Sequence, residues 1–101
     1  MSIRAINWAF NQQCGGSSAK LVLIKLADNA NDDGVCWPSI AYMELHCELS
    51  RTAIKENIKK LADAGLVTIQ ERFKDGVQLP HLYHLQLGVG SDVGVGRQVT
   101  D

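Results

Sequence analysis

Residues 50–66 read SRTAIKENIKKLADAGL, and this stretch carries the start and stop signals of one α-helix. Ser50 can cap the first turn, because its hydroxyl oxygen can accept a hydrogen bond from a backbone N–H group of that turn. Gly65 can adopt the left-handed conformation that commonly ends a helix, and Leu66 can then pack back on the last turn. Between these signals apolar residues recur at i, i+4 and i+7, namely Ile54, Ile58 and Leu61. The pattern predicts a helix over 50–64 with one apolar stripe facing a core.

The opposite face of this predicted helix is polar and mostly basic. Arg51 lies at its N-terminal edge, and the remaining side chains are Thr52, Lys55, Glu56 and Lys59. All except the glutamate can donate hydrogen bonds to bases or phosphates. Two interpretations remain open for the stretch alone, a recognition helix and an ordinary amphipathic helix with a solvated charged face.

The bulk composition indicates one soluble domain. The chain has 101 residues, with 46% hydrophobic and 21% charged residues, which suits one modest core. It has no apolar run of the roughly 20 residues that a membrane span needs. The N-terminus lacks the apolar segment and cleavage site of a signal peptide, which predicts a cytoplasmic protein. The three cysteines, Cys14, Cys36 and Cys47, are odd in number and lack zinc-ribbon spacing, so we expect reduced thiols.

The charge is unevenly distributed although the net charge is only −1. Residues 1–49 hold three basic and five acidic side chains, whereas residues 50–75 hold six basic and four acidic ones. Positive charge is therefore concentrated in the predicted helix and in the segment after it, where it could attract phosphates.

The N-terminal third predicts the centre of the core. Residues 3–12 carry Ile3, Ile6, Trp8 and Phe10, and both a short helix and an irregular apolar arm are open for them. We expect Trp8 to be a core anchor or, if it is exposed, an oligomer contact. Ser17 or Ser18 can cap a helix that runs to Ala27 and is apolar nearly all round, which predicts the central core helix.

A polar segment follows at residues 28–34. Asn29, Asn31, Asp33 and Gly34 resemble the front half of a calcium loop. The twelfth position, however, is Ile40, where such a loop needs a bidentate glutamate. The sequence therefore predicts a polar turn.

Residues 35–49 predict a short strand and a second helix. Val35–Trp37 reads as an extended segment before Pro38, and proline is favoured at a first helical position. The helix is expected from about Pro38 or Ser39 to His46. It should bury Ile40, Met43 and Leu45. Trp37 is expected to be a core anchor, and stacking on a partner is the alternative. The turn at 47–49 then leads into Ser50, so the two helices form a helix-turn-helix.

The remaining segments predict a hairpin and a tail. Residues 67–73 are rich in β-branched side chains and residues 78–87 alternate in part, with an Asp75-Gly76 turn between them and Pro80 delaying the second strand. With 35–37 these strands complete a small sheet. The predicted fold is α+β, a winged helix-turn-helix with a three-helix core and a small antiparallel sheet that includes a β-hairpin wing. We expect this domain over 1–87 and a flexible Gly/Val-rich tail or linker over 88–101, with another domain beyond.

Two further blocks carry a family resemblance. Residues 26–40 read LADNANDDGVCWPSI, and the segments LSRTAI (49–54) and KKLADAGLV (59–67) follow. Together they resemble the N-terminal winged-helix domains of phage and prophage replication-initiation proteins of the replication protein O type, and related phage helix-turn-helix proteins. The resemblance implies binding of double-stranded DNA at an origin or operator, and a C-terminal region that recruits replication proteins. Glu56 departs from the basic residue usual in the family, although Lys60 at i+4 can neutralise it.

Other chemistry finds little support. His81 and His84 lie three apart on a predicted strand and so point to opposite faces, and no third group or phosphate-binding loop completes a catalytic or cofactor site. We therefore expect no enzyme, no metal and no cofactor. An enzyme is the weakest of the three classes considered.

The sequence thus predicts a DNA-binding domain with a defined set of contacts. The candidate DNA-binding residues are Ser39, Ser50, Arg51, Thr52, Lys55, Lys59, Lys60, Arg72 and Lys74. The expected partner is double-stranded DNA, for a replication initiator or a transcriptional regulator. A homodimer through the N-terminal arm, with Trp8 and Phe10, and contacts to replication proteins through a C-terminal region are further expectations; no membrane contact is expected. The alternative is a winged-helix protein–protein interaction or dimerisation module without strong DNA binding.

Overall fold

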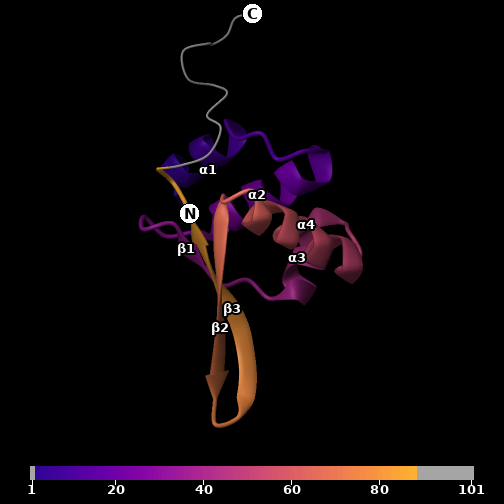
Figure 1. Ribbon diagram of the computed structural model, residues 1–101. Helices are drawn as coiled ribbons and strands as arrows, with labels where there is room; N and C mark the ends of the chain where they lie inside the picture. The colour runs from indigo at the N-terminus through magenta and orange to yellow at the C-terminus, as the bar shows by residue number, and fades with distance from the viewer. Residues whose placement is uncertain (1, 89–101) are drawn as a thin grey trace, which may run out of the picture.

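The computed structural model describes residues 2–88 and has the predicted α+β architecture of a winged helix-turn-helix. The helices gather at one end, and the β2–β3 hairpin projects beyond them (Figure 1). The element order is α1 (Ile3–Phe10), α2 (Ser17–Asn29), β1 (Val35–Cys36), α3 (Ile40–Cys47), α4 (Arg51–Asp63), β2 (Val67–Lys74) and β3 (Val77–Leu85). The described elements thus include a fourth helix besides the predicted three. All but the first residue of the predicted tail 88–101 lies outside the described residues.

Helix α2 is the centre of the core, as its composition predicts. It packs against α1, α3, α4 and β1, and Val22, Leu23 and Leu26 are fully buried. The prediction that Ser17 or Ser18 caps the helix is wrong, because Gly16 occupies the N-cap position without a side-chain hydrogen bond.

The N-terminal segment is a helix, which resolves the choice between a helix and an arm. Ser2 caps α1, and its hydroxyl oxygen accepts a hydrogen bond from the Ala5 N–H group at 3.2 Å. Trp8 is only 8% exposed and belongs to the core, whereas Phe10 is 58% exposed. The expectation that Trp8 is a core anchor is therefore confirmed, and its burial removes it from the expected dimer contact.

The sheet is antiparallel with strand order β1-β3-β2. Asp75 and Gly76 both have positive φ angles, 53° and 80°, which is the two-residue turn that the sequence predicts. Pro80 does not delay the second strand, since β3 begins at Val77. The register of the β2–β3 pair shifts at a β-bulge, where Glu71 of β2 faces Pro80 and the next residue of β3. A bulge tolerates proline because the residue there need not donate an N–H group to the hydrogen bonds between the strands.

Two predicted core residues are on the surface. Leu45 is 74% exposed and Trp37 is 53% exposed. Helix α3 buries Met43 and Cys47, which lie about one turn apart. Leu45 is two residues from each of them, a rotation of about 200° around the helix axis, so its side chain points to the opposite side of α3. The other parts of the segment are as predicted, with Ser39 capping α3 and Ile40 half-buried. The predicted turn over 28–34 begins later than expected, because Asp28 and Asn29 still belong to α2. In the turn that follows, Asn31 Oδ1 accepts from the N–H groups of Asp33 and Val35.

Lys20 joins α1 to α2 through the open carbonyl groups at the end of α1. Its Nζ donates to the carbonyl oxygens of Phe10 at 2.8 Å, of Ala9 at 3.2 Å and of Gln12. A cation at a helix C-terminus satisfies carbonyls that have no partner within the helix and is favoured by the helix dipole.

We expect Lys20→Met to lower the free energy of unfolding by about 1.5 to 3 kcal/mol, because it removes charge-assisted hydrogen bonds while keeping the aliphatic stem. Urea unfolding followed by circular dichroism measures this. The same change at exposed Lys74 is the control, and an equal effect at both positions would contradict the capping role of Lys20.

Burial of Cys36, a residue of β1, makes the free energy of unfolding depend on pH in the alkaline range. Desolvation raises the pKa of the Cys36 thiol from 9.0 to about 12, and burial also raises the pKa of its partner in the β1–β3 pair, Tyr83. Between about pH 9 and pH 12 the unfolded chain releases the thiol proton while the folded chain retains it, so the free energy of unfolding falls as pH rises. We expect this fall in urea titrations above pH 9, with a shallower slope in Cys36→Ala; identical slopes would contradict the assignment.

Candidate nucleic-acid interface

Helix α4 is capped at both ends as its sequence predicts. At the start, the Ser50 hydroxyl oxygen accepts from the Ala53 N–H group at 3.1 Å. At the end, Gly65 has a φ angle of 80° and the Leu66 N–H group donates to the Leu61 carbonyl oxygen at 3.0 Å. The pair of hydrogen bonds is completed by Gly65 N–H to Ala62 oxygen, which is the Schellman arrangement.

One face of α4 is buried and the other is free. The predicted apolar stripe is confirmed, since Ile54 and Leu61 are fully buried and Ile58 is 5% exposed. This stripe packs toward α2 and α3. The polar face is exposed in full, with Arg51, Thr52, Lys55, Glu56, Lys59 and Lys60 all in solvent. The packing of the stripe therefore fixes which side chains α4 presents outward.

An open groove runs between α4 and the hairpin. Its helical side includes Arg51 and Lys55, the start of α3 contributes Ser39, and β3 contributes residues 78–81. A second hollow adjoins it further along α4, where Lys59 lies opposite Ile69. The fold thus brings Ser39, Arg51 and Lys55, which are distant or separated in the sequence, to one concave surface.

The two neighbouring lysines of α4 lie on different flanks. Lys59 borders the hollow beside the hairpin. Lys60 lies along the α1–α2 loop, where a Cβ atom on Gly15 would come within 3.6 Å of Lys60 Cδ. Consecutive residues of a helix are about 100° apart, so Lys59 borders the exposed face on the side of the hairpin and Lys60 on the side of the α1–α2 loop.

Two of the basic side chains of α4 form exposed ion pairs with carboxylates. Arg51 Nη1 lies 3.9 Å from Glu44 Oε2, and Lys59 Nζ lies 3.0 Å from Asp63 Oδ2. All four side chains are at least one-third exposed, so each pair contributes little, on the order of 0 to 1 kcal/mol. Within residues 2–88, no recorded ion pair engages Lys55, Lys60 or Lys74.

The two predicted wing cations differ in their freedom. Arg72 is half-buried, and its Nε donates to the Pro80 carbonyl oxygen at 2.9 Å across the hairpin. Lys74 is exposed beside the turn. The arginine is therefore partly committed to the hairpin itself, whereas the lysine can reach a ligand.

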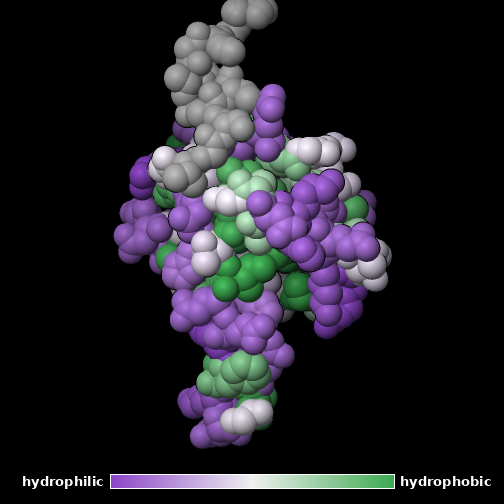
Figure 2. Space-filling model, viewed as in Figure 1, coloured by the Kyte–Doolittle hydropathy of each residue, from purple (hydrophilic) through white to green (hydrophobic). Residues whose placement is uncertain are grey.

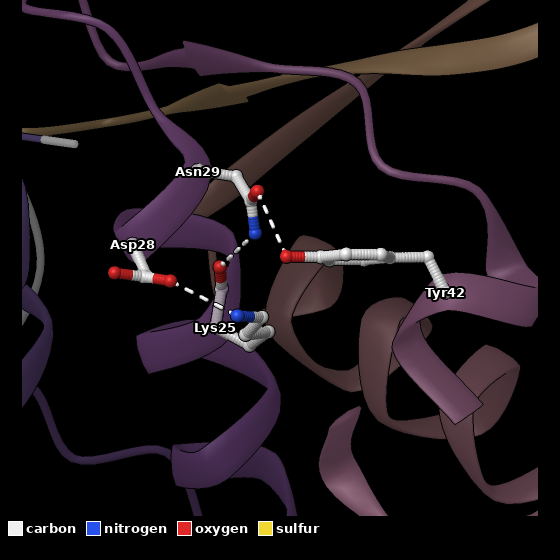
Figure 3. Close-up of polar contacts among 4 residues, drawn as sticks. All are labelled: Lys25, Asp28, Asn29 and Tyr42. Atoms are coloured by element: carbon white, nitrogen blue, oxygen red, sulfur yellow. Dashed lines mark hydrogen bonds and ion pairs between the residues drawn. The ribbon is translucent and has the colours of Figure 1, made fainter. Parts of the chain in front are cut away.

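A polar cluster that sequence reasoning missed ties α3 to α2 (Figure 3). Tyr42 Oη donates to Asn29 Oδ1 at 3.3 Å, and Asn29 Nδ2 donates to the Lys25 carbonyl oxygen at 2.9 Å. Lys25 Nζ lies 2.9 Å from Asp28 Oδ2 and 5.1 Å from the centre of the Tyr42 ring. Hydrogen bonds to Asp28 and then to Tyr42 raise the pKa of Lys25. The cluster holds α3, and with it the first half of the helix-turn-helix, at a fixed position on the core.

Two features of the described residues concern metal binding and thiol reactivity. Within 2–88, no group of three or more His, Cys, Asp or Glu side chains gathers as a metal site would require. Burial raises the pKa values of Cys14, Cys36 and Cys47, which keeps these thiols protonated and poorly nucleophilic. In the same part of the chain, no helix is long and apolar enough to cross a membrane.

The fold and this exposed face define a winged helix-turn-helix protein, and comparison with known proteins agrees. The sequence pattern of the family described as "Helix-turn-helix domain" matches residues 16–67, from the start of α2 to the start of β2, and the chain belongs to that family. It is also similar to Protein YmfN of Escherichia coli (strain K12), with 32% identity over 72 residues. That match covers 67% of this chain but only 16% of YmfN. No solved structure matches the chain significantly.

The Schellman end of α4 can be tested directly. We expect Gly65→Ala to lower the free energy of unfolding by about 1 kcal/mol, because a Cβ atom is disfavoured at a φ angle of 80° although it would meet no neighbour within 4 Å. Thermal and urea unfolding measure the change. Gly88→Ala, where the added Cβ is also free of contacts and φ is not positive, is the matched control. Equal stability of the two variants would contradict the strain assigned to Gly65.

Proposed function

We propose that this chain binds double-stranded DNA in a sequence-dependent manner, with α4 in the major groove. The observation that carries the proposal is the exposed basic face of α4, held beside the wing in a member of the helix-turn-helix family. An α-helix fits the major groove, where each base pair presents a distinct pattern of donors and acceptors.

The proposed base contacts come from the first turns of α4. Arg51, Thr52 and Lys55 reach base edges, and Arg51 is the best candidate for guanine because its fork matches two acceptors. The 3.9 Å pair with Glu44 is exposed and weak, so it competes little with a guanine. Glu56, on the same exposed face, can accept a hydrogen bond from a cytosine amino group.

The proposed phosphate contacts surround that helix. Lys59 and Lys60 border it on different flanks, which suits the two backbones that line a major groove. Ser39 and Ser50 stand at the starts of α3 and α4, where backbone N–H groups favour phosphates. Lys74 contacts the backbone or minor groove from the wing, with Arg72 in a lesser part because of its bond to Pro80.

We further propose a biological setting. The blocks 26–40, 49–54 and 59–67 resemble phage and prophage initiators, which supports a role in replication initiation or transcriptional regulation in the cytoplasm. In that setting the domain over residues 1–87 is non-enzymatic and works without a cofactor, as one module of a longer protein whose C-terminal region recruits replication proteins. The chain spans only 16% of YmfN, so the activity of such a whole protein is part of the proposal.

A second candidate function is a protein-interaction or dimerisation module. Exposed Ile3 and Phe10 lie on one stripe of α1, seven residues apart, and Glu56 interrupts the basic face of α4. Since Trp8 is buried, a homodimer through α1 would depend on Ile3 and Phe10. Apolar contacts of this kind change little with salt, whereas DNA binding weakens steeply.

Substitutions should separate base contacts from phosphate contacts. We expect Arg51→Ala to cost roughly 1 to 3 kcal/mol on the preferred duplex and to relax preference at one base pair. Lys74→Ala should weaken binding to all sequences alike and reduce the salt slope by about 1. Binding to a duplex selected from a random pool, and to the unselected pool, measures both. Arg4→Ala, at an exposed arginine of α1, is the control and should change neither. Uniform loss on every sequence for Arg51→Ala would contradict its role in base recognition.

A further inference from the structure

The tip of the hairpin carries apolar side chains that the domain itself does not cover. Phe73 is 61% exposed and Val77 is 63% exposed. Figure 2 shows hydrophobic residues on the otherwise polar hairpin, near the end that projects from the helices. Leaving a phenylalanine in water forgoes about 1.5 to 3 kcal/mol of burial, so this position gains when a partner covers it.

Phe73 stands on the same face of the hairpin as the hollow beside α4. Ile69 lines that hollow together with Lys55 and Lys59. Phe73 lies four residues after Ile69 on the same strand, β2, and side chains an even number of residues apart on a strand project to one face. A ligand seated against α4 therefore lies on the side of the hairpin that bears Phe73.

The hairpin is long enough to reach beyond the groove that α4 would occupy. From Ile69, which lies opposite α4, to Lys74 at the turn is five residues, or about 17 Å of strand. The major groove is about 12 Å wide. With α4 in the major groove, the tip can pass the adjoining backbone and meet the minor groove.

The charge of the tip indicates what kind of contact it makes there. Arg72 and Lys74 are offset by Glu71 and Asp75, so residues 71–75 carry no net charge. Arg72 is also bound to the Pro80 carbonyl. Among residues 71–75 this leaves Lys74 to contact a phosphate. Counterion release at the tip is therefore small, and most of the contribution of the tip must come from apolar contact.

We propose that the wing tip enters the minor groove with the Phe73 ring as an apolar wedge that partly unstacks one base step and bends the duplex. This inference rests on the proposed DNA binding. It adds the groove that the wing enters, the residue that makes the contact and the bend of the duplex that results. Apolar side chains act on DNA in this way by packing on sugars and between bases, with bends of roughly 20 to 90°. The wedge favours sites with a flexible pyrimidine–purine step under the tip, which gives sequence preference without a hydrogen bond to a base.

The test uses a duplex selected from a random-sequence pool, labelled with donor and acceptor dyes at its two ends and, in a second version, with 2-aminopurine at successive steps. The unaltered protein should shorten the end-to-end distance and raise 2-aminopurine fluorescence at one step. Phe73→Ala should abolish both signals and reduce affinity by on the order of 10- to 100-fold, to the same extent at low and high salt. Phe73→Leu should retain part of the bend. Leu21→Ala is the control, because Leu21 is an apolar side chain that is 42% exposed on α2, away from α4 and the hairpin, and it should leave all signals unchanged.

The outcomes of this test distinguish failure of the wedge proposal from failure of the proposed DNA binding. Sequence-dependent binding by both proteins, with the same bend and the same 2-aminopurine signal in Phe73→Ala, overturns the wedge and leaves DNA binding intact. Failure of the unaltered protein to bind any duplex at low salt overturns both proposals. In that case the mass in solution of both proteins is measured as a function of concentration. If the mass of the unaltered protein rises and that of Phe73→Ala does not, the tip is a contact between protein chains.

Discussion

The placement of the exposed basic face depends on how the apolar stripe of α4 packs. Ile54, Ile58 and Leu61 are buried against α2 and α3, and that packing sets the rotation of the helix about its own axis. Because an α-helix has 3.6 residues per turn, burial of this stripe places Thr52, Lys55 and Lys59 on the solvent-exposed side of α4. The caps at Ser50 and Gly65 fix the length of the helix, so the basic face is both oriented and bounded by local chemistry.

The structure divides positive charge and apolar surface between two elements. Helix α4 presents cations whose recorded ion pairs are exposed and weak. The hairpin presents a tip without net charge, with Phe73 and Val77 in solvent. On the proposed account, the helix supplies charge-dependent attraction and base contacts, and the wing supplies contact that depends on shape. Such a division lets a chain with a net charge of −1 bind a polyanion, because only the contacting surface needs to be positive.

Local signals predicted most of the fold. The cap at Ser50, the left-handed Gly65 and the Asp75-Gly76 turn are each determined by a few neighbouring residues, and all are confirmed. Predictions that depend on distant contacts were less reliable. Leu45 and Trp37 look like core residues by hydrophobicity alone. Leu45, however, lies opposite the buried side of α3, and Trp37 directly follows the buried Cys36 of β1, so both are exposed. The contacts among Lys25, Asn29 and Tyr42 that hold α3 there join residues up to 17 apart and leave no periodic signal. The placement of Ser39 beside Arg51 and Lys55 likewise follows only from the packed helices.

Binding to duplex DNA across a series of salt concentrations, with the mass in solution recorded alongside, tests the central claim most directly. Three phosphate-directed cations, Lys59, Lys60 and Lys74, give a slope of log affinity against log salt of roughly −3. The account predicts that slope, together with tighter binding to a selected duplex than to random sequence. A folded protein that shows no binding at low salt, or binding that does not change with salt, would contradict it.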